Sequence, residues 1–332
     1  MSDVPEQSAL FDLPERMIEP VPPSAEVRAL AAALPESLLL GAMTWSYPGW
    51  HGVVYKRPHA EKELAALGLT AYSKQPLLRV AEVDRSYYEP LPAAVFRQFA
   101  EQVPDDFRFV VKAHEDCSVE RYPQHARYGK KRGLLNERYL DPEYATRAVI
   151  EPLAGLGDKL HSVLFQFSPI LPTPDEPAQR EFAARLHAFL SALPKGLTYA
   201  VELRTEALLT RHYGAALVDS GAIHCHSAWT YMPSVLEQAR KLPPETRRPL
   251  LVRWLLRRGE RYEQANARFE PFSRIQEEDP GTREEVATLV HKALQHNVPV
   301  CTLVDNKAEG CAPQSIELLA RALRSRQAIT ST

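Results

Sequence analysis

The chain has 332 residues, and its 40 Lys and Arg against 42 Asp and Glu leave a formal net charge of −2. This near balance excludes a protein whose whole surface binds nucleic acid. Hydrophobic residues make up 45% of the chain, enough for a large core, and the length suits one (β/α)8 barrel or two medium domains.

Cysteines and short motifs exclude several further classes. The four cysteines contain no C-x-x-C pair, so we expect neither a disulfide framework nor a structural zinc site. No basic start precedes an apolar segment at the N-terminus, and no run approaches roughly 18 apolar residues. Glycine-rich nucleotide-binding motifs and H-E-x-x-H are absent, so no cofactor is indicated. We predict a cytoplasmic protein that does not cross a membrane.

The first 36 residues differ in composition from the rest. They hold six prolines, seven acidic residues and two arginines, and few large apolar side chains. Such a segment cannot bury much surface, except where Ser24 can cap a short Ala/Leu helix. We therefore expect an acidic, proline-rich tail and a docking helix over residues 1–36, followed by one domain over 37–328.

From Leu38 onward, short apolar runs alternate with helical periodicity, which is typical of parallel strands joined by helices. Helices are expected near 59–67, 92–102, 142–156 and 176–193, and from about Pro313. The sequence thus predicts the α/β class and a single, possibly irregular (β/α)8 TIM barrel. The eight predicted strands are 38–43, 77–83, 107–112, 162–167, 198–203, 215–219, 250–254 and 300–304.

Polar residues lie at or just beyond the C-terminal end of each of the last seven predicted strands. In a parallel barrel the carboxyl ends of the strands meet at one rim, so residues far apart in sequence would form one pocket. For any single residue, the first solvated position of a loop is an equally good interpretation. The residues concerned are Glu82, Lys112, Gln166, Glu202, Arg204, Asp219, Arg253, Asp305 and Asn306.

Several segments together resemble the domain of unknown function 72 family, the YecE-like proteins, over roughly residues 38–325. The resemblance implies a TIM barrel but no established reaction. Departures occur at Asp84, Arg85 and Asp305, and where Arg253-Trp254-Leu255-Leu256 replaces an expected R-L-H-G tract. The similar segments are GAMTWSYPGW (41–50), VAEVDRSYY (80–88), FRFVVKA (107–113), VLFQFSP (163–169), AVELR (200–204) and residues 304–313.

The predicted rim contains candidate catalytic groups. Glu82 and Glu202 could form an acid/base pair if unequal burial, or Lys112 and Arg204, splits their protonation states. Alternatively these four residues are structural ion pairs, because a buried carboxylate needs a cation. Lys112 could also be a Schiff-base nucleophile. A hydrolase, isomerase or lyase is the most plausible enzyme class.

Other residues are candidates for ligand binding. The segment 305–315 leads into a helix whose N-terminus is a natural anion site, unless the helix simply starts at Pro313. Trp45, Tyr47 and Trp50 could form an aromatic wall for a sugar or base, or pack within their loop. We expect a small anionic or polyhydroxylated ligand. The predicted binding residues are Trp45, Tyr47, Gln166, Asp219, Arg253, Asp305 and Asn306.

Metal and nucleic acid are alternative ligands. We expect no metal, because His224, Cys225 and His226 lack a third ligand on the same side, and Lys and Arg would oppose a cation at the rim. Segments 117–138 and 244–262 each carry six Arg or Lys and two Glu, and both are predicted near the mouth. The alternative to an acid/base enzyme is therefore a noncatalytic nucleic-acid or regulatory binding module.

Overall fold

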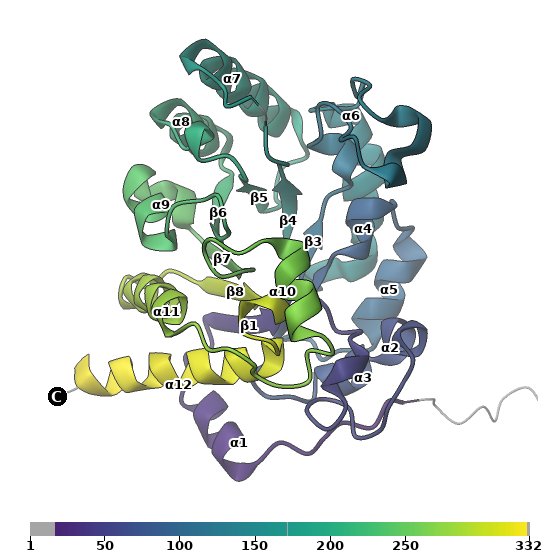
Figure 1. Cartoon of the computed structure of the whole chain (residues 1–332), viewed down its shortest axis with the longest axis vertical. Coiled ribbons are helices and arrows are strands. Elements are labelled where there is room, and N and C mark those ends of the chain that lie inside the picture. Colours follow the sequence, from purple (N-terminus) through teal and green to yellow (C-terminus); the bar gives the residue numbers. More distant parts are fainter. Residues whose placement is uncertain (1–16, 171, 331–332) are drawn as a thin grey trace, which may run out of the picture.

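The computed structural model describes residues 17–170 and 172–330. Its parallel strands form a closed barrel in which each strand pairs with the next along the chain and β8 pairs with β1 (Figure 1). The predicted (β/α)8 barrel is confirmed. The strands are β1 Leu38–Ala42, β2 Val80–Val83, β3 Arg108–Lys112, β4 Leu160–Gln166, β5 Tyr199–Glu202, β6 Ile223–Ala228, β7 Leu250–Trp254 and β8 Val300–Val304.

Helices surround the barrel (Figure 1). The helix expected near 142–156 starts as α6 and continues as a π turn and a 3-10 segment, which bends at Gly157 with φ 54°. The helices are α1 Ala25–Ala32, α2 Glu61–Leu67, α3 Leu69–Tyr72, α4 Arg85–Tyr88, α5 Ala93–Glu101, α6 Pro142–Ala145, α7 Glu176–Ala192, α8 Arg211–Ser220, α9 Val235–Lys241, α10 Tyr262–Phe269, α11 Pro280–Gln295 and α12 Ala312–Thr330.

Apolar side chains pack on both faces of the strands. In β7, Leu250 and Val252 belong to the large core cluster, whereas Leu251 belongs to a second, smaller cluster. Successive strand residues point to opposite faces, so the smaller cluster is the barrel interior and the larger one lies between barrel and helices. The interior cluster includes Val80, Val110, Leu164, Ala200, Cys225, Leu251 and Cys301.

The predicted sixth strand is wrong. Residues 215–219 lie in helix α8, which Thr210 caps and Gly221 ends with φ 75°. A short apolar run does not by itself distinguish a strand from a buried helical face, and here the buried Tyr213 and Leu217 are four residues apart. The true sixth strand is β6, with His224 and His226 fully buried.

Helix α1 precedes the barrel. The Ser24 side chain accepts a hydrogen bond from the Val27 N–H at 3.2 Å, and α1 packs against α12 (Figure 1). The part of the predicted tail that precedes Met17 lies outside the described residues. Among the helices that the structure describes, none is long and apolar enough to span a membrane.

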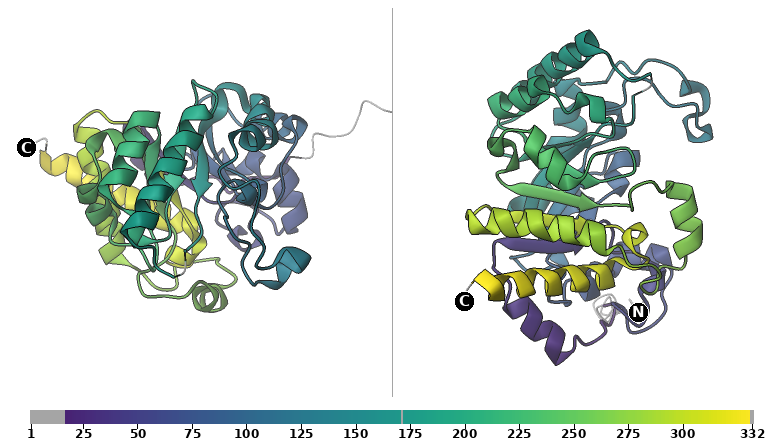
Figure 2. Two further views of the ribbon diagram at one scale, coloured as in Figure 1. Left: turned by 90° about the horizontal axis from the view of Figure 1, so that it is seen from above. Right: turned by 60° about the vertical axis from the view of Figure 1, so that its left-hand side comes forward.

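Two segments project from the same side of the barrel. Figure 2 (right) shows the connection between β3 and α6, and helix α10 after β7, extending beyond the ring of helices. Both follow the carboxyl ends of their strands. They therefore flank the end of the barrel where functional sites of this fold lie.

Candidate functional site

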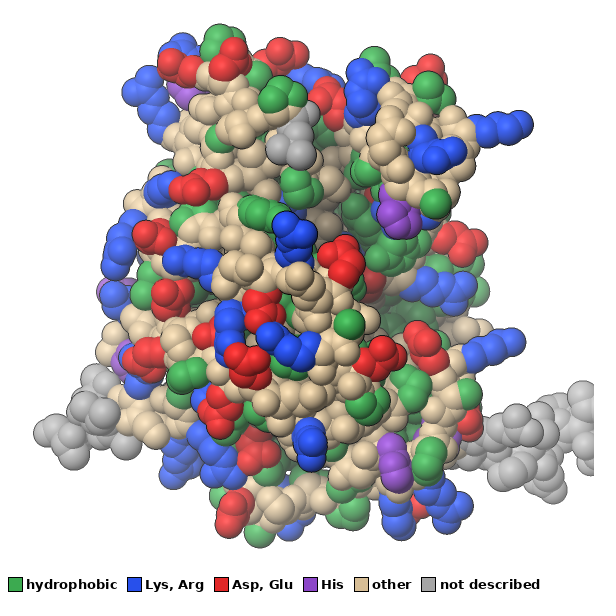
Figure 3. All heavy atoms as spheres, viewed as in Figure 1, with side chains coloured by type: hydrophobic (Ala, Val, Ile, Leu, Met, Phe, Trp, Pro, Cys, Tyr) green, Lys and Arg blue, Asp and Glu red, His purple; other side chains and the backbone are tan. Residues whose placement is uncertain are grey.

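A cavity of about 1500 Å³ lies at the carboxyl ends of the strands. Residues that follow all eight strands line it, from Thr44 after β1 to Asp305 after β8. Figure 3 views the molecule from this side, and hydrophobic (green) side chains are visible in the recess beside its centre. The predicted convergence of the strand ends on one mouth is thus observed.

Alternation along the strands brings the polar residues together. Glu202 lies two positions after the interior residue Ala200, and Arg253 two positions after Leu251. Side chains two apart share a face, so these polar residues extend the interior rows into the mouth. The same spacing places Glu82 after Val80, Lys112 after Val110 and Gln166 after Leu164.

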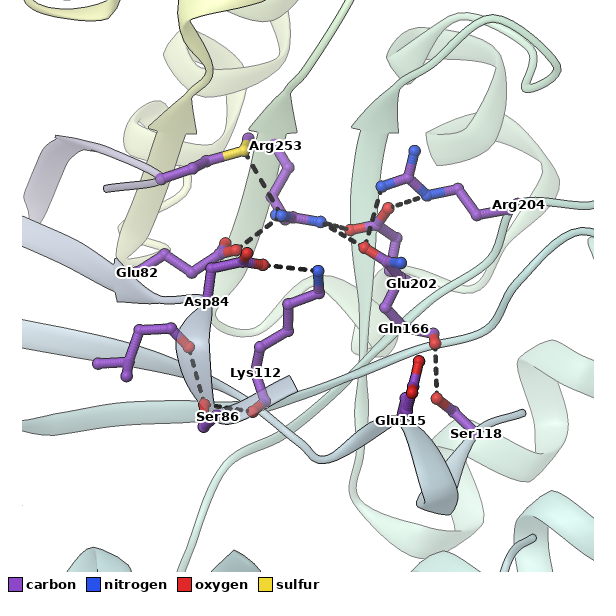
Figure 4. A network of polar contacts seen from close by, with 12 residues as sticks. Glu82, Asp84, Ser86, Lys112, Glu115, Ser118, Gln166, Glu202, Arg204 and Arg253 are labelled. Carbon is purple, nitrogen blue, oxygen red and sulfur yellow. Dashed lines mark hydrogen bonds and ion pairs between the residues drawn. The ribbon is translucent and has the colours of Figure 1, made fainter. Parts of the chain in front are cut away.

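Arg253 links two buried carboxylates at the floor of the cavity (Figure 4). Its Nη2 donates to Glu82 Oε1 at 2.8 Å, and its Nη1 donates to Glu202 Oε2. Glu202 also forms an ion pair with the Nε of Arg204. Gln166 Oε1 accepts hydrogen bonds from Arg204 at 3.1 Å and from Arg253 at 3.3 Å. Four strands therefore contribute to one continuous network.

The two carboxylates of this network differ in protonation. Burial raises the pKa of Glu82 to about 7, which outweighs the opposing effect of Arg253 and Lys112. Burial would also raise the pKa of Glu202, but Arg204 and Arg253 outweigh it and the pKa is lowered. Such a split between neighbouring carboxyl groups is characteristic of acid/base sites.

The two carboxylates also differ in access to the cavity. Glu82 lines it, and among the described residues its Oε2 has no hydrogen-bond partner. Glu202 is completely buried and is not among the described residues that line the cavity, whereas Arg204 and Arg253 are. Glu202 consequently supports the arginines from below, whereas Glu82, although it is only 1% exposed, borders the cavity.

Lys112 contacts both a carboxylate and an aromatic ring. Its Nζ forms an ion pair with Asp84 at 2.7 Å (Figure 4). The same Nζ lies 4.1 Å from the centre of the Tyr87 ring. Burial opposes ionisation of Asp84, but Lys112 outweighs it, and the pKa of Asp84 is lowered. A Schiff-base nucleophile must be neutral, so both contacts disfavour that role.

The predicted anion site at the N-terminus of α12 is occupied by the protein itself. Asn306 Oδ1 accepts hydrogen bonds from the Ala312 N–H at 2.9 Å and from the Trp50 indole at 3.0 Å. The Gln314 N–H faces the Cys311 sulfur, and Pro313 has no N–H. Since these groups are already paired, the alternative of a plain helix start is the better interpretation.

The other predicted binding residues divide between the cavity and the core. Asp305 lines the cavity, where its carboxylate pairs with Lys307 at 2.8 Å. Tyr47 is half-buried at the wall and packs edge-on against Phe272, with ring centres 5.2 Å apart. Trp45 also reaches the wall, but its ring packs against Phe99 at 5.0 Å and is mostly buried.

Asp219 does not lie at the rim, contrary to the prediction. It is exposed on α8, outside the barrel, because the run that contains it is helical. In the true sixth strand, Cys225 points inward, 4.0 Å from Glu202, and His224 bonds to Tyr213 of α8 at 2.9 Å. Over the described parts of the chain, no group of three His, Cys, Asp or Glu is arranged to hold a metal ion.

The two basic segments are placed differently. Arg127 and Tyr128, in the connection after β3, line the cavity, and Arg127 pairs with Glu115. In the second segment only the part from Arg253 onward reaches the mouth, because the 3-10 turn Pro244–Arg247 precedes strand β7. The expectation that all of 244–262 lies near the mouth is wrong for this first part.

Several cavity residues were not singled out from the sequence. Trp229 and Tyr231 follow β6, so they were missed when that strand was misplaced. The guanidinium of Arg204 lies 4.0 Å from the centre of the Trp229 ring. Tyr87 and Tyr88 lie on α4 directly after β2, and a search for aromatic residues just beyond correctly placed strands would have found all four.

The fold and the cavity define a (β/α)8-barrel protein with a mixed-charge pocket at the carboxyl ends of its strands. Residues 39–332 match the model of the family described as protein of unknown function DUF72, and the chain belongs to this family. Among proteins with curated descriptions, no sequence matches this chain significantly.

Solved structures with this fold include two DUF72 family proteins. The protein from Enterococcus faecalis V583 is 17% identical, with a TM-score of 0.58 over 86% of this chain and 95% of its own. The protein from Thermotoga maritima MSB8 is also 17% identical, with a TM-score of 0.50 over 87% of this chain and 98% of its own. At this identity the similarity establishes the shared fold alone.

Proposed function

We propose that this protein is an enzyme that transfers a proton to or from a small anionic ligand bound at the mouth of the barrel, with Glu82 as the general acid/base. The hydrogen bonding and the raised pKa of Glu82 support this proposal most directly. One of its oxygens is held by Arg253, the other is unpartnered within the described structure, and burial raises its pKa to about 7. A carboxyl group with this pKa both accepts and donates protons near neutral pH.

Charge at the cavity supports an anionic ligand. Eight Lys and Arg line it against six Asp and Glu, and the neutral form of Glu82 removes one of those negative charges. At the floor, Lys112 and Arg204 line the cavity next to the network that contains Glu82. We therefore assign binding of the anionic group to these two cations. Preorganised cations stabilise negative charge that develops during proton abstraction.

In the proposed reaction, Glu82 moves a proton from one atom of the ligand to another. Glu82 Oε2 takes a proton from an acidic C–H or O–H of the ligand, which leaves the electron pair on the ligand as negative charge next to Arg204 and Lys112. The protonated Glu82 then returns the proton to another atom of the ligand or to a leaving group. Such a cycle describes an isomerase or lyase and requires no further reactant.

Glu202 acts as a positioning residue in this proposal. Its buried carboxylate contacts Arg204 and Arg253 and lies below the cavity surface. Two charge-assisted contacts hold the arginine side chains in one orientation. Long, flexible side chains do not keep a single orientation without such contacts. The role expected for Glu202 from the sequence, as a partner in proton transfer, is therefore replaced by support of the arginines.

The test uses Glu82→Gln, which keeps a hydrogen-bonding side chain of the same size and removes titration. Small phosphates and carboxylates are first screened for binding to the wild-type protein by thermal shift, and those that bind are incubated in D2O. NMR then measures deuterium incorporation. We expect Glu82→Gln to lower the exchange rate by at least ~100-fold while binding persists. Glu260→Gln, at the cavity edge, is the matched control.

The result that would overturn the proposal is exchange by Glu82→Gln at the wild-type rate. The noncatalytic alternative rests on Lys130, Lys131 and Arg132, which are exposed on the connection after β3. If those charges bind a polyanion while no screened ligand undergoes exchange, a nucleic-acid binding module becomes the better assignment.

A further inference from the structure

Three exposed tyrosines surround the mouth of the cavity. Tyr88, Tyr231 and Tyr262 are 56%, 61% and 47% exposed, and within the described chain they are the aromatic residues with large exposed surfaces. All three line the same cavity. A random distribution over the surface would not gather them there, and exposed aromatic surface at a concave site commonly contacts a ligand.

The tyrosines come from three different connections. Tyr88 ends α4 after β2, Tyr231 lies between β6 and α9, and Tyr262 begins α10 after β7. Cations lie against two of them: the Arg127 guanidinium is 5.1 Å from the Tyr88 ring centre, and Lys307 Nζ is 4.6 Å from that of Tyr262. These contacts fix the rings from one side and leave aromatic surface toward solvent.

Tyr231 differs from the other two because it is the most exposed. It follows Trp229, whose ring packs on Arg204 of the charged floor. The segment Trp229–Tyr231 therefore leads from the cations at the floor to aromatic surface at the mouth. A ligand that reaches from one to the other must carry two chemically different parts.

The volume of the cavity agrees with a ligand larger than a simple anion. Typical small-molecule pockets measure roughly 300–1000 Å³, and this cavity measures about 1500 Å³. A phosphate or carboxylate at Arg204 would occupy a small part of it and would leave the tyrosines without a contact. A planar ring on the ligand would gain affinity by stacking on these aromatic side chains.

We propose that the ligand joins an anionic group, bound at the floor by Arg204 and Lys112, to a planar ring that stacks on Tyr231 and Tyr262 at the mouth. A nucleoside monophosphate has both parts, and an aryl phosphate is the simplest molecule that shares the same chemistry. The inference rests on the proposed function only for the position of the anionic group, and it names the class of substrate for that site.

The test compares ligands that differ in the ring. Isothermal titration of the full chain measures Kd for adenosine 5′-phosphate, phenyl phosphate and ribose 5-phosphate. We expect both ring-bearing phosphates to bind on the order of tenfold more tightly than ribose 5-phosphate, because stacking adds to the shared anion contact. If only adenosine 5′-phosphate shows this gain, the ligand is a nucleotide; if both do, any planar ring suffices.

Variants connect the gain to the mouth. Tyr231→Ala and Tyr262→Ala should each remove most of the preference for the ring-bearing phosphates and leave the Kd of ribose 5-phosphate unchanged. Tyr231→Phe keeps the ring and should retain the preference. Leu197→Ala is the control, since Leu197 is exposed outside the cavity. Because Tyr231 is largely solvent-exposed, its replacement should not prevent folding.

The outcomes separate this inference from the proposed function. Equal affinity for ribose 5-phosphate and the ring-bearing phosphates, no binding of either ring-bearing phosphate, or an unchanged preference in Tyr231→Ala and Tyr262→Ala would each overturn it. Ring-dependent binding that Glu82→Gln leaves intact supports it, whether or not deuterium exchange occurs. Failure of exchange alone contradicts only the role of Glu82.

Discussion

Two regions at the mouth of the barrel contain the ingredients of an anion site, yet only one presents them to a ligand. At the floor, Arg204 and Arg253 line the cavity beside Glu82, one of whose oxygens has no partner among the residues that the structure covers. At the start of α12, Asn306 and Cys311 already pair with the first N–H groups of the helix. The comparison teaches that ion pairs within the fold do not by themselves exclude a site, provided that the same cluster keeps a polar atom without a partner in the described structure, as Glu82 does.

The largest effect is expected at the link between the two carboxylates of the floor. Arg253→Ala leaves Glu82 and Glu202 buried side by side without their common partner, and should lower the free energy of unfolding by about 3–5 kcal/mol. Urea denaturation at neutral pH measures it. Arg253→Lys keeps one positive charge and should lose less; equal losses for both variants would show that charge is unimportant there.

The contribution of Glu82 to the stability of the protein should depend on pH, unlike that of a carboxylate with an ordinary pKa. Its pKa is raised in the folded state to about 7 from 4.5, so the native protein binds more protons than the unfolded chain between these values. The contribution of Glu82 to the free energy of unfolding is therefore largest below about pH 4.5, falls as the pH rises toward about 7, and stays low at higher pH.

Replacing Glu82 by Gln should abolish this contribution. The difference in unfolding free energy between wild type and Glu82→Gln should change by up to about 3 kcal/mol from about pH 5 to pH 8, in favour of the variant at high pH. Urea denaturation across this range measures the difference. A difference that does not vary with pH would mean that Glu82 ionises normally in the folded protein.

A smaller effect is expected at the start of α12. Asn306→Ala removes the acceptor for the Ala312 N–H and for the Trp50 indole, and should cost about 1–2 kcal/mol of stability. The affinity for phosphate should not change. If phosphate binding by titration calorimetry weakens tenfold while Arg204→Gln has no effect, the assignment of the two regions is reversed.

The smallest effects are expected outside both regions. Asp219→Asn changes an exposed residue on α8 and should alter stability by less than about 0.5 kcal/mol, with no change in ligand affinity. The triple variant Lys130→Ser, Lys131→Ser, Arg132→Ser should likewise leave phosphate binding unchanged. Loss of deuterium exchange in Asp219→Asn would contradict the position assigned to the site.

The sequence was sufficient for the barrel and for the floor of the site. The apolar runs are nearly continuous in parallel strands covered on both faces, and a polar residue two positions beyond an interior residue must point into the mouth. Glu82, Lys112, Gln166, Arg204 and Arg253 were identified because each lies at or just beyond the C-terminal end of a predicted strand. Their meeting follows from barrel closure, which needs no knowledge of side-chain contacts.

Other features depended on the tertiary structure. The run that contains Asp219 is helical because Tyr213 and Leu217 pack against the barrel and Gly221 ends the turn. Strand β6 instead carries His224, which is buried against its hydrogen-bond partners Tyr213 of α8 and Gln238 of α9. Local sequence does not report such partners, since burial of a polar side chain is favourable only when a distant group completes its hydrogen bonds.

The sequence by itself therefore determined the class of fold, most of the strands and the end of the barrel at which polar groups gather, because strand periodicity and closure are local rules repeated along the chain. Only the tertiary structure decided that Glu202 lies beneath the arginines, that Asn306 is consumed as a cap and that three tyrosines share one mouth. Those outcomes depend on distances between residues far apart in the chain, which are established when the helices pack around the closed barrel.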